Sequence, residues 1–376
     1  MESVSSTRGG ALRLLALSPV PPEGAGCRFR VMQYIPALEH AGFAVTVAPF
    51  FDAAFFDLVY RPGHHARKVA AFLRQSVRRF QLLLTRERFD AFFVYREAYP
   101  FGPAVFESVL AHTGGRPLIY DFDDAIFLSN SSEANRLASS LKYPQKVPAI
   151  IRRSAMVLAG NDYLADYARR FNSSVEVLPT CVDTNVFVPR KTPRPAGAPL
   201  VVGWIGTPTT AAYLKSLSVS LGRLASDHAF EVRVSGSGGA VEFPGVKTVN
   251  ERWSLDREVE LFNTCDVGVY PLTDDEWAKG KCGFKAIQFM ACGVPVVAAA
   301  VGVNREIIQD GVNGFLASTE REWHQKLGLL LADADLRQRL GGAGRKTIEE
   351  RYSLAVNAPR LVGMLRGVMD RRARAA

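Results

Sequence analysis

The chain has 376 residues, of which 48% are hydrophobic and 22% are charged. These proportions are typical of a soluble globular protein and exclude a largely disordered one. The length exceeds what one ordinary core supports and predicts two domains. A net charge of +9 favours anionic partners, such as phosphates, anionic lipid surfaces or nucleic acid, without choosing among them.

Short apolar strands alternate with helical patterns in the first half of the chain. Strands are predicted over residues 12–18, 43–50, 91–96, 117–123, 156–160 and 175–180. Residues 28–42 have helical spacing, with Val31, Ile35, Leu38 and Ala41 on one face. Strand–helix–strand alternation implies a parallel sheet covered by helices on both faces.

A proline-rich, basic segment at residues 188–200 is the best linker in the chain. A second series of strands follows at residues 200–206, 230–236, 246–250, 267–272 and 294–301. We therefore predict a first α/β domain over residues 1–190 and a second over 191–352. Residues 353–376 are expected to form a C-terminal helix that packs back toward the first domain.

The cysteines and the apolar runs indicate the compartment. The five cysteines are widely spaced and include no CxxC pair, which argues against a disulfide framework or a zinc site and favours a reducing cytoplasm. The short N-terminal apolar run is interrupted by Arg13, and we interpret it as a first strand rather than a signal peptide. No apolar run reaches the length that spans a bilayer. We expect a cytoplasmic protein, with peripheral contact to the inner face of the membrane left open.

A lysine- and glycine-rich segment, KGKCGFK (279–285), precedes a helical pattern and then a β-branched strand. The N-terminus of a helix offers free N–H groups and the positive end of the dipole, so it suits an anion. Gly280 and Gly283 let the backbone approach a ligand closely, and Lys281 and Lys285 add positive charge. We predict that the segment stabilises a phosphate-bearing leaving group. Taken alone, a solvated helix start is the commoner interpretation of such a segment.

The sequence resembles the retaining family 4 glycosyltransferases, which have the two-domain GT-B fold. FKAIQFMACGVPVVA (284–298), followed by EIIQDGVNGFLA (306–317), carries most of the resemblance. Further segments agree with the family in order and spacing, namely residues 21–47, 178–187, 201–214 and 232–239. The resemblance covers most of the chain and implies two Rossmann-like domains with parallel sheets that face each other across a cleft.

The resemblance implies transfer of a hexose-type sugar from a nucleotide sugar, with retention at the anomeric carbon. The second domain would hold the nucleotide and the first the acceptor, which is a glycan, a lipid-linked sugar or a small molecule. Polysaccharide biosynthesis is the commonest use of the family. A uridine diphosphate sugar is favoured, with guanosine diphosphate mannose next. The resemblance implies neither a metal nor a cofactor beyond the nucleotide sugar, which acts as co-substrate.

The predicted site residues follow from these motifs and from the resemblance. The catalytic candidates are Asp123, Asp124 and Lys285. The donor-binding candidates are Gly24, Gly26, Arg28, Gly206, Thr207, Gly236, Trp253, Lys281, Cys282, Gly283, Phe284, Gln288, Arg305 and Glu306.

The two aspartates follow an apolar strand, where clustered carboxylates contact a sugar hydroxyl or act as a base; a turn that caps the next helix is the alternative. Arg28 lies in the first turn of a helix, where a cation opposes the dipole unless an anion lies between them. Trp253 lies where the family binds the base, although a packing role is as frequent.

The chain departs from the family at one pair of glutamates. Aligned on MACG, their positions are Gly280 and Gln288, and only Gln288 could still bond a ribose hydroxyl. The family's Arg and Lys after the second domain's first strand are also missing, because threonines and a proline occupy residues 207–210. An alternative to the enzyme is therefore a catalytically weak nucleotide-sugar-binding subunit that partners another glycosyltransferase. A nucleic-acid binder is disfavoured, because interleaved aromatic residues are missing.

Residues 64–84 form an amphipathic helical pattern. One face carries Val69, Phe72, Leu73, Ser76, Val77, Phe80 and Leu83, and another carries Arg67, Arg74 and Arg78. Such a helix would suit docking on an anionic membrane. Packing on the sheet with a solvated basic face is the commoner arrangement.

Overall fold

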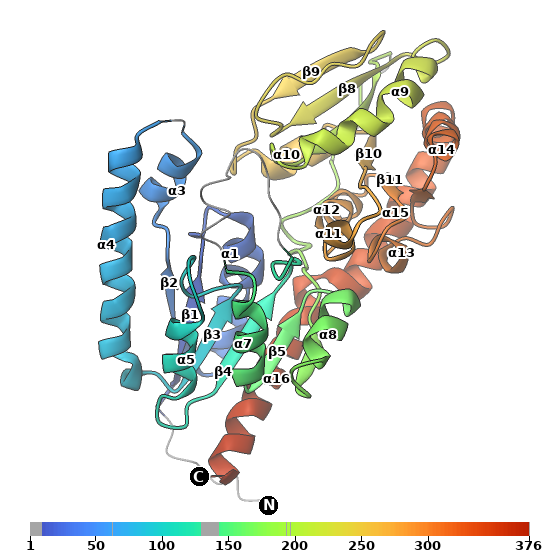
Figure 1. Cartoon of the computed structure of the whole chain (residues 1–376). Helices are drawn as coiled ribbons and strands as arrows, with labels where there is room; N and C mark the ends of the chain where they lie inside the picture. Colours follow the sequence, from blue (N-terminus) through green and yellow to red (C-terminus); the bar gives the residue numbers. More distant parts are fainter. Residues whose placement is uncertain (1–9, 62, 129–142, 193, 196, 376) are drawn as a thin grey trace, which may run out of the picture.

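The computed structural model describes residues 10–61, 63–128, 143–192, 194–195 and 197–375. These residues form two parallel β-sheets of six strands each, one from each half of the chain (Figure 1). The predicted α/β class with parallel sheets is therefore confirmed.

Every strand of the two sheets except β12 lies close to a predicted range, and β12 was not predicted. The first sheet contains β1 Leu12–Ser18, β2 Phe43–Pro49, β3 Ala91–Tyr95, β4 Leu118–Phe122, β5 Met156–Ala159 and β6 Val175–Val177. The second contains β7 Leu200–Ile205, β8 Phe230–Ser235, β9 Lys247–Glu251, β10 Val267–Tyr270, β11 Val296–Ala299 and β12 Phe315–Ala317.

The helices that follow the first-sheet strands are α1 Ala25–Arg30, α2 Ile35–His40, α3 Ala53–Tyr60, α4 His65–Leu84, α5 Val105–Ala111, α7 Lys146–Arg153 and α8 Asp162–Arg169. Those of the second half are α9 Ser218–Leu224, α10 Glu258–Asn263, α11 Glu276–Lys279, α12 Phe284–Ala291, α13 Asn304–Ile307, α14 Glu320–Ala332, α15 Ala334–Thr347 and α16 Leu354–Ala375. Three further segments are 3-10 helices, namely η1 Met32–Tyr34, η2 Arg86–Arg88 and η4 Ala211–Leu217. One is a π-helix, η5 Ile348–Tyr352.

The order of strands creates a switch point in each sheet. The first sheet runs β2-β1-β3-β4-β5-β6, so the chain leaves β1 in one direction and returns to its other side at β3. The second runs β12-β11-β10-β7-β8-β9 and has its switch between β7 and β10. In open parallel sheets, ligands bind outside the carboxyl ends of the strands at such points. The topology therefore directs attention to the loops after β1, β3, β7 and β10.

The linker and the last helix tie the two sheets together. Arg190 and Arg194 of the linker donate to the buried Asp266 at 2.8 and 2.5 Å, and Asp266 also accepts from the N–H of Val201 at the start of β7. Figure 1 shows that α16 returns to the first sheet. This helix packs on α2, and its apolar side chains enter the core beside β1.

The helix expected over residues 28–42 is wrong as a single element. The structure has α1, the turn η1 and then α2, with a break at Val31. Pro36 lies in the first turn of α2, where its missing N–H is tolerated. The same proline inside a longer helix would remove a hydrogen bond and press on the preceding turn. The apolar residues have helical spacing, but the proline divides the segment into two helices.

Candidate functional site

The N-terminus of α12 lies in a cluster of polar residues at the carboxyl end of the second sheet. Lys285 Nζ donates to Gln288 Oε1 at 2.7 Å, and Gln288 Nε2 donates to Glu258 Oε1 at 3.2 Å. Arg28 Nη2 donates to the other oxygen of Glu258 at 2.8 Å. Arg28 comes from α1 of the first half, so this chain of four side chains joins the two halves of the protein.

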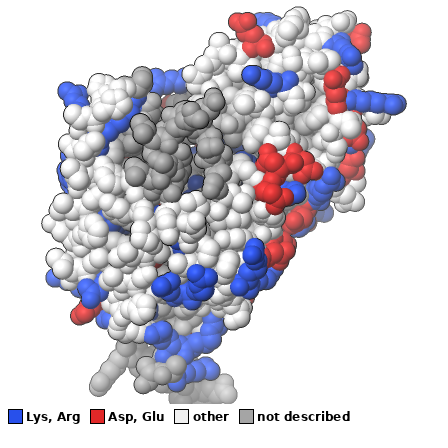
Figure 2. Space-filling view, in the orientation of Figure 1, with Lys and Arg blue, Asp and Glu red and all other residues white. Residues whose placement is uncertain are grey.

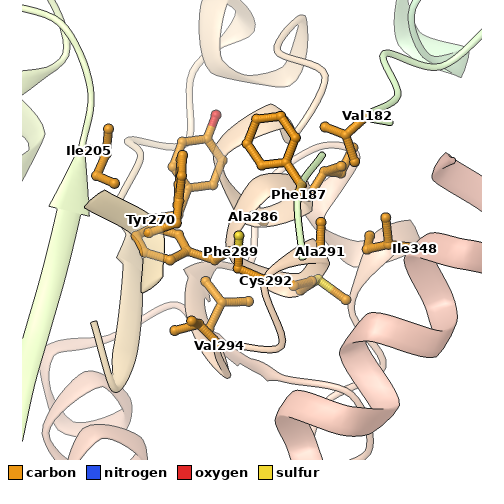
Figure 3. Close-up of a cluster of buried hydrophobic side chains, with 14 of the residues drawn as sticks. Val182, Phe187, Ile205, Tyr270, Ala286, Phe289, Ala291, Cys292, Val294 and Ile348 are labelled. Carbon is orange, nitrogen blue, oxygen red and sulfur yellow. The ribbon is translucent and has the colours of Figure 1, made fainter. Parts of the chain in front are cut away.

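The helix beneath this cluster is held rigidly. Residues 286–291 of α12 are buried, and Figure 3 shows Ala286, Phe289 and Ala291 among the apolar side chains around them. Phe187, from the segment that leaves the first sheet, belongs to the same group. The first residue of α12, Phe284, meets Phe29 edge to face at 4.5 Å between ring centroids. The polar groups at this helix end are therefore preorganised.

Without a bound anion, burial destabilises the charged forms of Lys285 and Arg28. Burial lowers the pKa of Lys285 to about 8, with Glu258 opposing the change and Arg28 adding to it. Burial also lowers the pKa of Arg28, and Glu258 offsets part of the effect. Arg28 Nε and Nη1 are buried and have no hydrogen-bond partner within the described residues. Two unpaired donors beside a destabilised ammonium suit a multiply charged anion such as a diphosphate.

A second polar cluster forms in the first half of the protein, where β3 and β4 end. Asp123 accepts from Tyr95 Oη and Arg96 Nε, both at 2.8 Å. Arg96 Nη2 also contacts Asp124 at 3.2 Å, and Lys281 Nζ of the second half lies 3.5 Å from Asp124. Arg96 has a positive φ of 57°, a conformation that costs energy outside glycine and recurs at functional sites.

Asp123 is held in its charged form by these partners. Burial raises the pKa of Asp123, but Arg96 and Arg30 lower it by more than burial raises it. The net result is a pKa below the ordinary value. The Asp123 carboxylate therefore accepts hydrogen bonds at neutral pH and does not serve as a proton donor. Such a group suits contact with sugar hydroxyls.

The segment between α11 and α12 lies against the end of β4, far away in sequence. Cys282 Sγ approaches the carbonyl oxygen of Asp123 at 3.2 Å, and Asn161 Nδ2 donates to the carbonyl oxygen of Lys281 at 3.0 Å. A Cβ on Gly280 would lie 2.5 Å from Ala125 Cβ and 3.0 Å from Ala125 N. The position where the family has a glutamate is thus filled by the first domain's own backbone.

Gly280→Ala is therefore expected to lower the free energy of unfolding by about 1.5 kcal/mol, because the added methyl group overpacks the contact with Ala125. Urea unfolding measures the loss. Gly239→Ala is the control, since nothing lies within 4 Å of a Cβ at that position. Equal stability of the two variants would show that the space between Gly280 and Ala125 accommodates a methyl group.

Two glycine turns lie at the carboxyl ends of β7 and β8 in the second sheet. Gly206 follows β7 and Gly236 follows β8, and a Cβ on Gly236 would collide with the carbonyl oxygen of Gly206. Thr207 is exposed beside them, with its hydroxyl 2.8 Å from that of Thr209. Trp253 follows β9 and lies near Arg28, whose guanidinium carbon is 5.9 Å from the ring centroid. These residues border the Arg28–Lys285 cluster on the side of β8 and β9.

Some of the remaining predicted residues lie in the first half of the protein and the others in the second half. Gly24 and Gly26 lie in the loop and first turn after β1, and a Cβ on Gly26 would collide with Tyr95 Oη. Gly283 caps α12 with a positive φ of 64°. Arg305 and Glu306 lie in α13 and are exposed, and within the described residues neither forms a hydrogen bond or ion pair with the cluster around Lys285. Burial and Asp162 of the first domain raise the pKa of Glu306.

Two residues of these clusters were missed at the sequence level. Arg96 directly follows a buried strand, a position that could have been flagged by the same rule that selected Asp123. Glu258 lies at helical spacing with the buried Leu261 and Phe262, so the pattern could have indicated a buried carboxylate. Within the described residues, no group of three or more His, Cys, Asp or Glu side chains could hold a metal ion.

Comparison with known sequences finds glycosyltransferases. A family model described as glycosyl transferases group 1 matches residues 214–333. A D-inositol 3-phosphate glycosyltransferase of Stackebrandtia nassauensis is 30% identical over 244 residues, which are 56% of this chain and 53% of that protein. An uncharacterised glycosyltransferase of Methanocaldococcus jannaschii is 32% identical over 97 residues, 25% of this chain and 26% of its own. The chain thus spans about half or less of these two relatives.

Comparison with solved structures finds the same architecture. Sucrose-phosphate synthase of Thermosynechococcus elongatus superposes with a TM-score of 0.65 at 16% identity, over 96% of this chain and 100% of that one. Anabaena HepE in complex with UDP and glucose has a TM-score of 0.65 at 16% identity, over 94% and 99% of the two chains. This architecture shows that the chain has the predicted GT-B fold, and the sequence match shows that residues 214–333 are similar to the glycosyl transferases group 1 family.

Proposed function

We propose that this protein transfers a hexose-type sugar from a uridine diphosphate sugar to an acceptor, with retention at the anomeric carbon. One observation carries the proposal. Arg28 and Lys285 converge at the N-terminus of α12, and two buried guanidinium nitrogens lack a partner within the described residues. The solved structures of HepE with UDP and with UDP-glucose support the choice of nucleotide.

The chemistry places growing negative charge where these cations lie. The acceptor oxygen bonds to the anomeric carbon while the bond from that carbon to the diphosphate oxygen breaks, and the acceptor's proton passes to the released diphosphate. The transition state is oxocarbenium-like, as in other glycosyl transfers. Lys285, Arg28 and the first N–H groups of α12 stabilise the departing diphosphate without rearrangement. Gln288 and Glu258 position both cations.

The acceptor side is assigned to Arg96, Asp123 and Asp124. The ionised Asp123 carboxylate suits the hydroxyl groups of a sugar, whether the acceptor is a glycan, a lipid-linked sugar or a small molecule. We propose that the reaction takes place in the cytoplasm. We also propose that the cations make a metal dispensable, so EDTA is expected to leave turnover unchanged.

The alternative of a catalytically weak binding subunit is motivated by the family glutamates that are missing at Gly280 and Gln288. The contact with Ala125 gives Gly280 a packing reason to be glycine. Gln288 takes part in the hydrogen-bonded cluster with Lys285 and Glu258.

Thermal unfolding with UDP, GDP, ADP and TDP, without added metal, tests the donor site. A ligand that binds only the native state raises the melting temperature in proportion to the logarithm of its concentration over Kd. We expect a shift with UDP. A shift with another nucleotide instead would support the donor site but show that the base is not uracil. No shift with any of the four would contradict the proposed donor site.

Nucleotide affinity is expected to fall above about pH 8. The free enzyme holds Lys285 with a pKa of about 8, and a bound diphosphate raises that pKa because it favours the ammonium form. Below pH 8 the amine is already protonated and affinity is constant. Above it, a proton must be taken up on binding, so Kd rises about tenfold per pH unit. Calorimetric titration of UDP between about pH 7 and about pH 9 measures this. Lys285→Arg should have a flat profile, and a flat profile in the unmodified protein would contradict the assignment.

A further inference from the structure

Helix α4 exposes an apolar stripe along its length. Five of its side chains lie one helical turn apart on one face and are more than half exposed: Val69 58%, Leu73 58%, Val77 57%, Phe80 52% and Leu84 81%. Each of the other elements has at most one exposed large hydrophobic side chain among the described residues. Scattered apolar residues on a surface are ordinary, but a continuous stripe marks an interaction site.

The exposure is not the result of a loosely placed helix, because its opposite face is fixed by specific polar contacts. Ser76 Oγ lies 2.9 Å from Tyr99 Oη, and Gln75 hydrogen-bonds to Asp52. Arg79 is buried and directs its guanidinium toward the carbonyl oxygen of Ser18 at 3.4 Å. Burial lowers the pKa of Arg79 to about 10. The helix is therefore anchored by the buried Gln75, Ser76 and Arg79, with Phe72, Leu82 and Leu83 half-buried beside them. The apolar stripe lies outside this packed face.

The charged side chains of α4 itself are all positive. Helix α4 contains five Arg and Lys residues and no Asp or Glu. Arg74 and Arg78 flank the stripe with 56% and 62% of their side chains exposed, and both approach one carboxylate, Asp52, at 3.3 and 3.7 Å. Figure 2 shows blue and white along the margin that α4 forms, and Figure 1 places α4 on the outer side of the first sheet, away from the second.

We propose that α4 docks the protein on an anionic phospholipid surface, with the apolar stripe among the acyl chains and the arginines at the headgroups. A helix that lies in the membrane interface has this combination of an apolar face and a basic one. An anionic surface attracts each nearby Arg, whereas a second copy of the same helix would bring like charges together. Among the described residues, no helix is both long and apolar enough to cross a membrane. The contact is therefore peripheral.

Co-sedimentation with vesicles tests the proposal. We expect the protein to bind vesicles that contain phosphatidylglycerol at least tenfold more tightly than vesicles of phosphatidylcholine alone, and less tightly at high salt. Leu73→Glu with Val77→Glu should lower binding roughly tenfold or more, because both side chains leave the apolar phase. Val219→Glu with Leu329→Glu, two exposed positions of the second half, should bind like the unmodified protein.

Each outcome decides the proposal. All the substituted positions are exposed, so melting temperatures should match and a binding loss reflects the surface. Absence of vesicle binding, or equal binding by the α4 variant, would overturn it. A concentration-dependent dimer that the α4 variant abolishes, without vesicle binding, would identify a second copy of the chain as the occupant. The test does not depend on transferase activity, so it stands or falls apart from the proposed function.

Discussion

Lys285→Met is expected to weaken nucleoside diphosphate binding roughly 30-fold and to lower turnover by about 100-fold. The methionine keeps the length and the apolar stem of the side chain but removes the ammonium that Gln288 and Glu258 position. The melting temperature without ligand should not fall, because burial already disfavours that charge, as the lowered pKa of about 8 shows.

Calorimetry with UDP and a donor-turnover assay measure the two effects. Lys279→Met is the matched control, since Lys279 lies six residues earlier and pairs with Glu276 at 2.7 Å on the surface. Nucleotide affinity equal to that of the control would remove Lys285 from the donor site. A variant that melts well below the control would instead show that the ammonium is a structural group.

Glu258→Gln is expected to lower the free energy of unfolding by about 3 kcal/mol. Glu258 is 5% exposed and neutralises Arg28 across the two halves of the protein. Removing one partner of a buried ion pair leaves the other charge uncompensated. Gln288→Glu alone would place a second carboxylate where Gln288 Nε2 now donates to Glu258 at 3.2 Å.

The two substitutions together exchange the residues and restore one carboxylate to the cluster. We expect the double variant to be more stable than the sum of the single effects predicts, by about 2 kcal/mol. Urea unfolding of the four proteins measures this coupling. Glu260→Gln, an exposed neighbour paired with Arg257, is the control for the helix itself. Strict additivity would mean that the two side chains do not share a network.

The elements of the fold were predictable where a local pattern suffices. Each predicted strand appears within a few residues of its expected range, because apolar runs between turn residues specify buried parallel strands. The helix over residues 28–42 failed because Pro36 divides it, and the apolar period alone does not register that break. In α4 the length was right, but the spacing could not tell which face would be covered. On the predicted apolar face, Val69, Leu73, Val77 and Phe80 are exposed, whereas Phe72, Ser76 and Leu83 are buried or half-buried.

The candidate site was only partly predictable. Lys285 and the N-terminus of α12 could be proposed because a helix start after glycine and lysine is a local feature. Glu258 and Arg96 were missed, since their importance depends on partners elsewhere in the chain. Arg305 and Glu306 follow a strand as predicted, yet they are exposed on α13 and, in the part of the chain that the structure describes, do not bond to the Lys285 cluster.

The sequence by itself determined the series of strands and helices and the arrangement in two sheets, because these follow from spacings within a few residues. It also indicated the strand ends at which polar residues would lie. Only the tertiary structure decided which of these polar residues contact each other. Arg28 and Glu258 are 230 residues apart, and Lys281 and Asp124 are 157 apart. Gly280 is confined by Ala125 of the other half. Such contacts depend on how two finished sheets dock against each other, and that arrangement is a property of the packed surfaces rather than of any local run of residues.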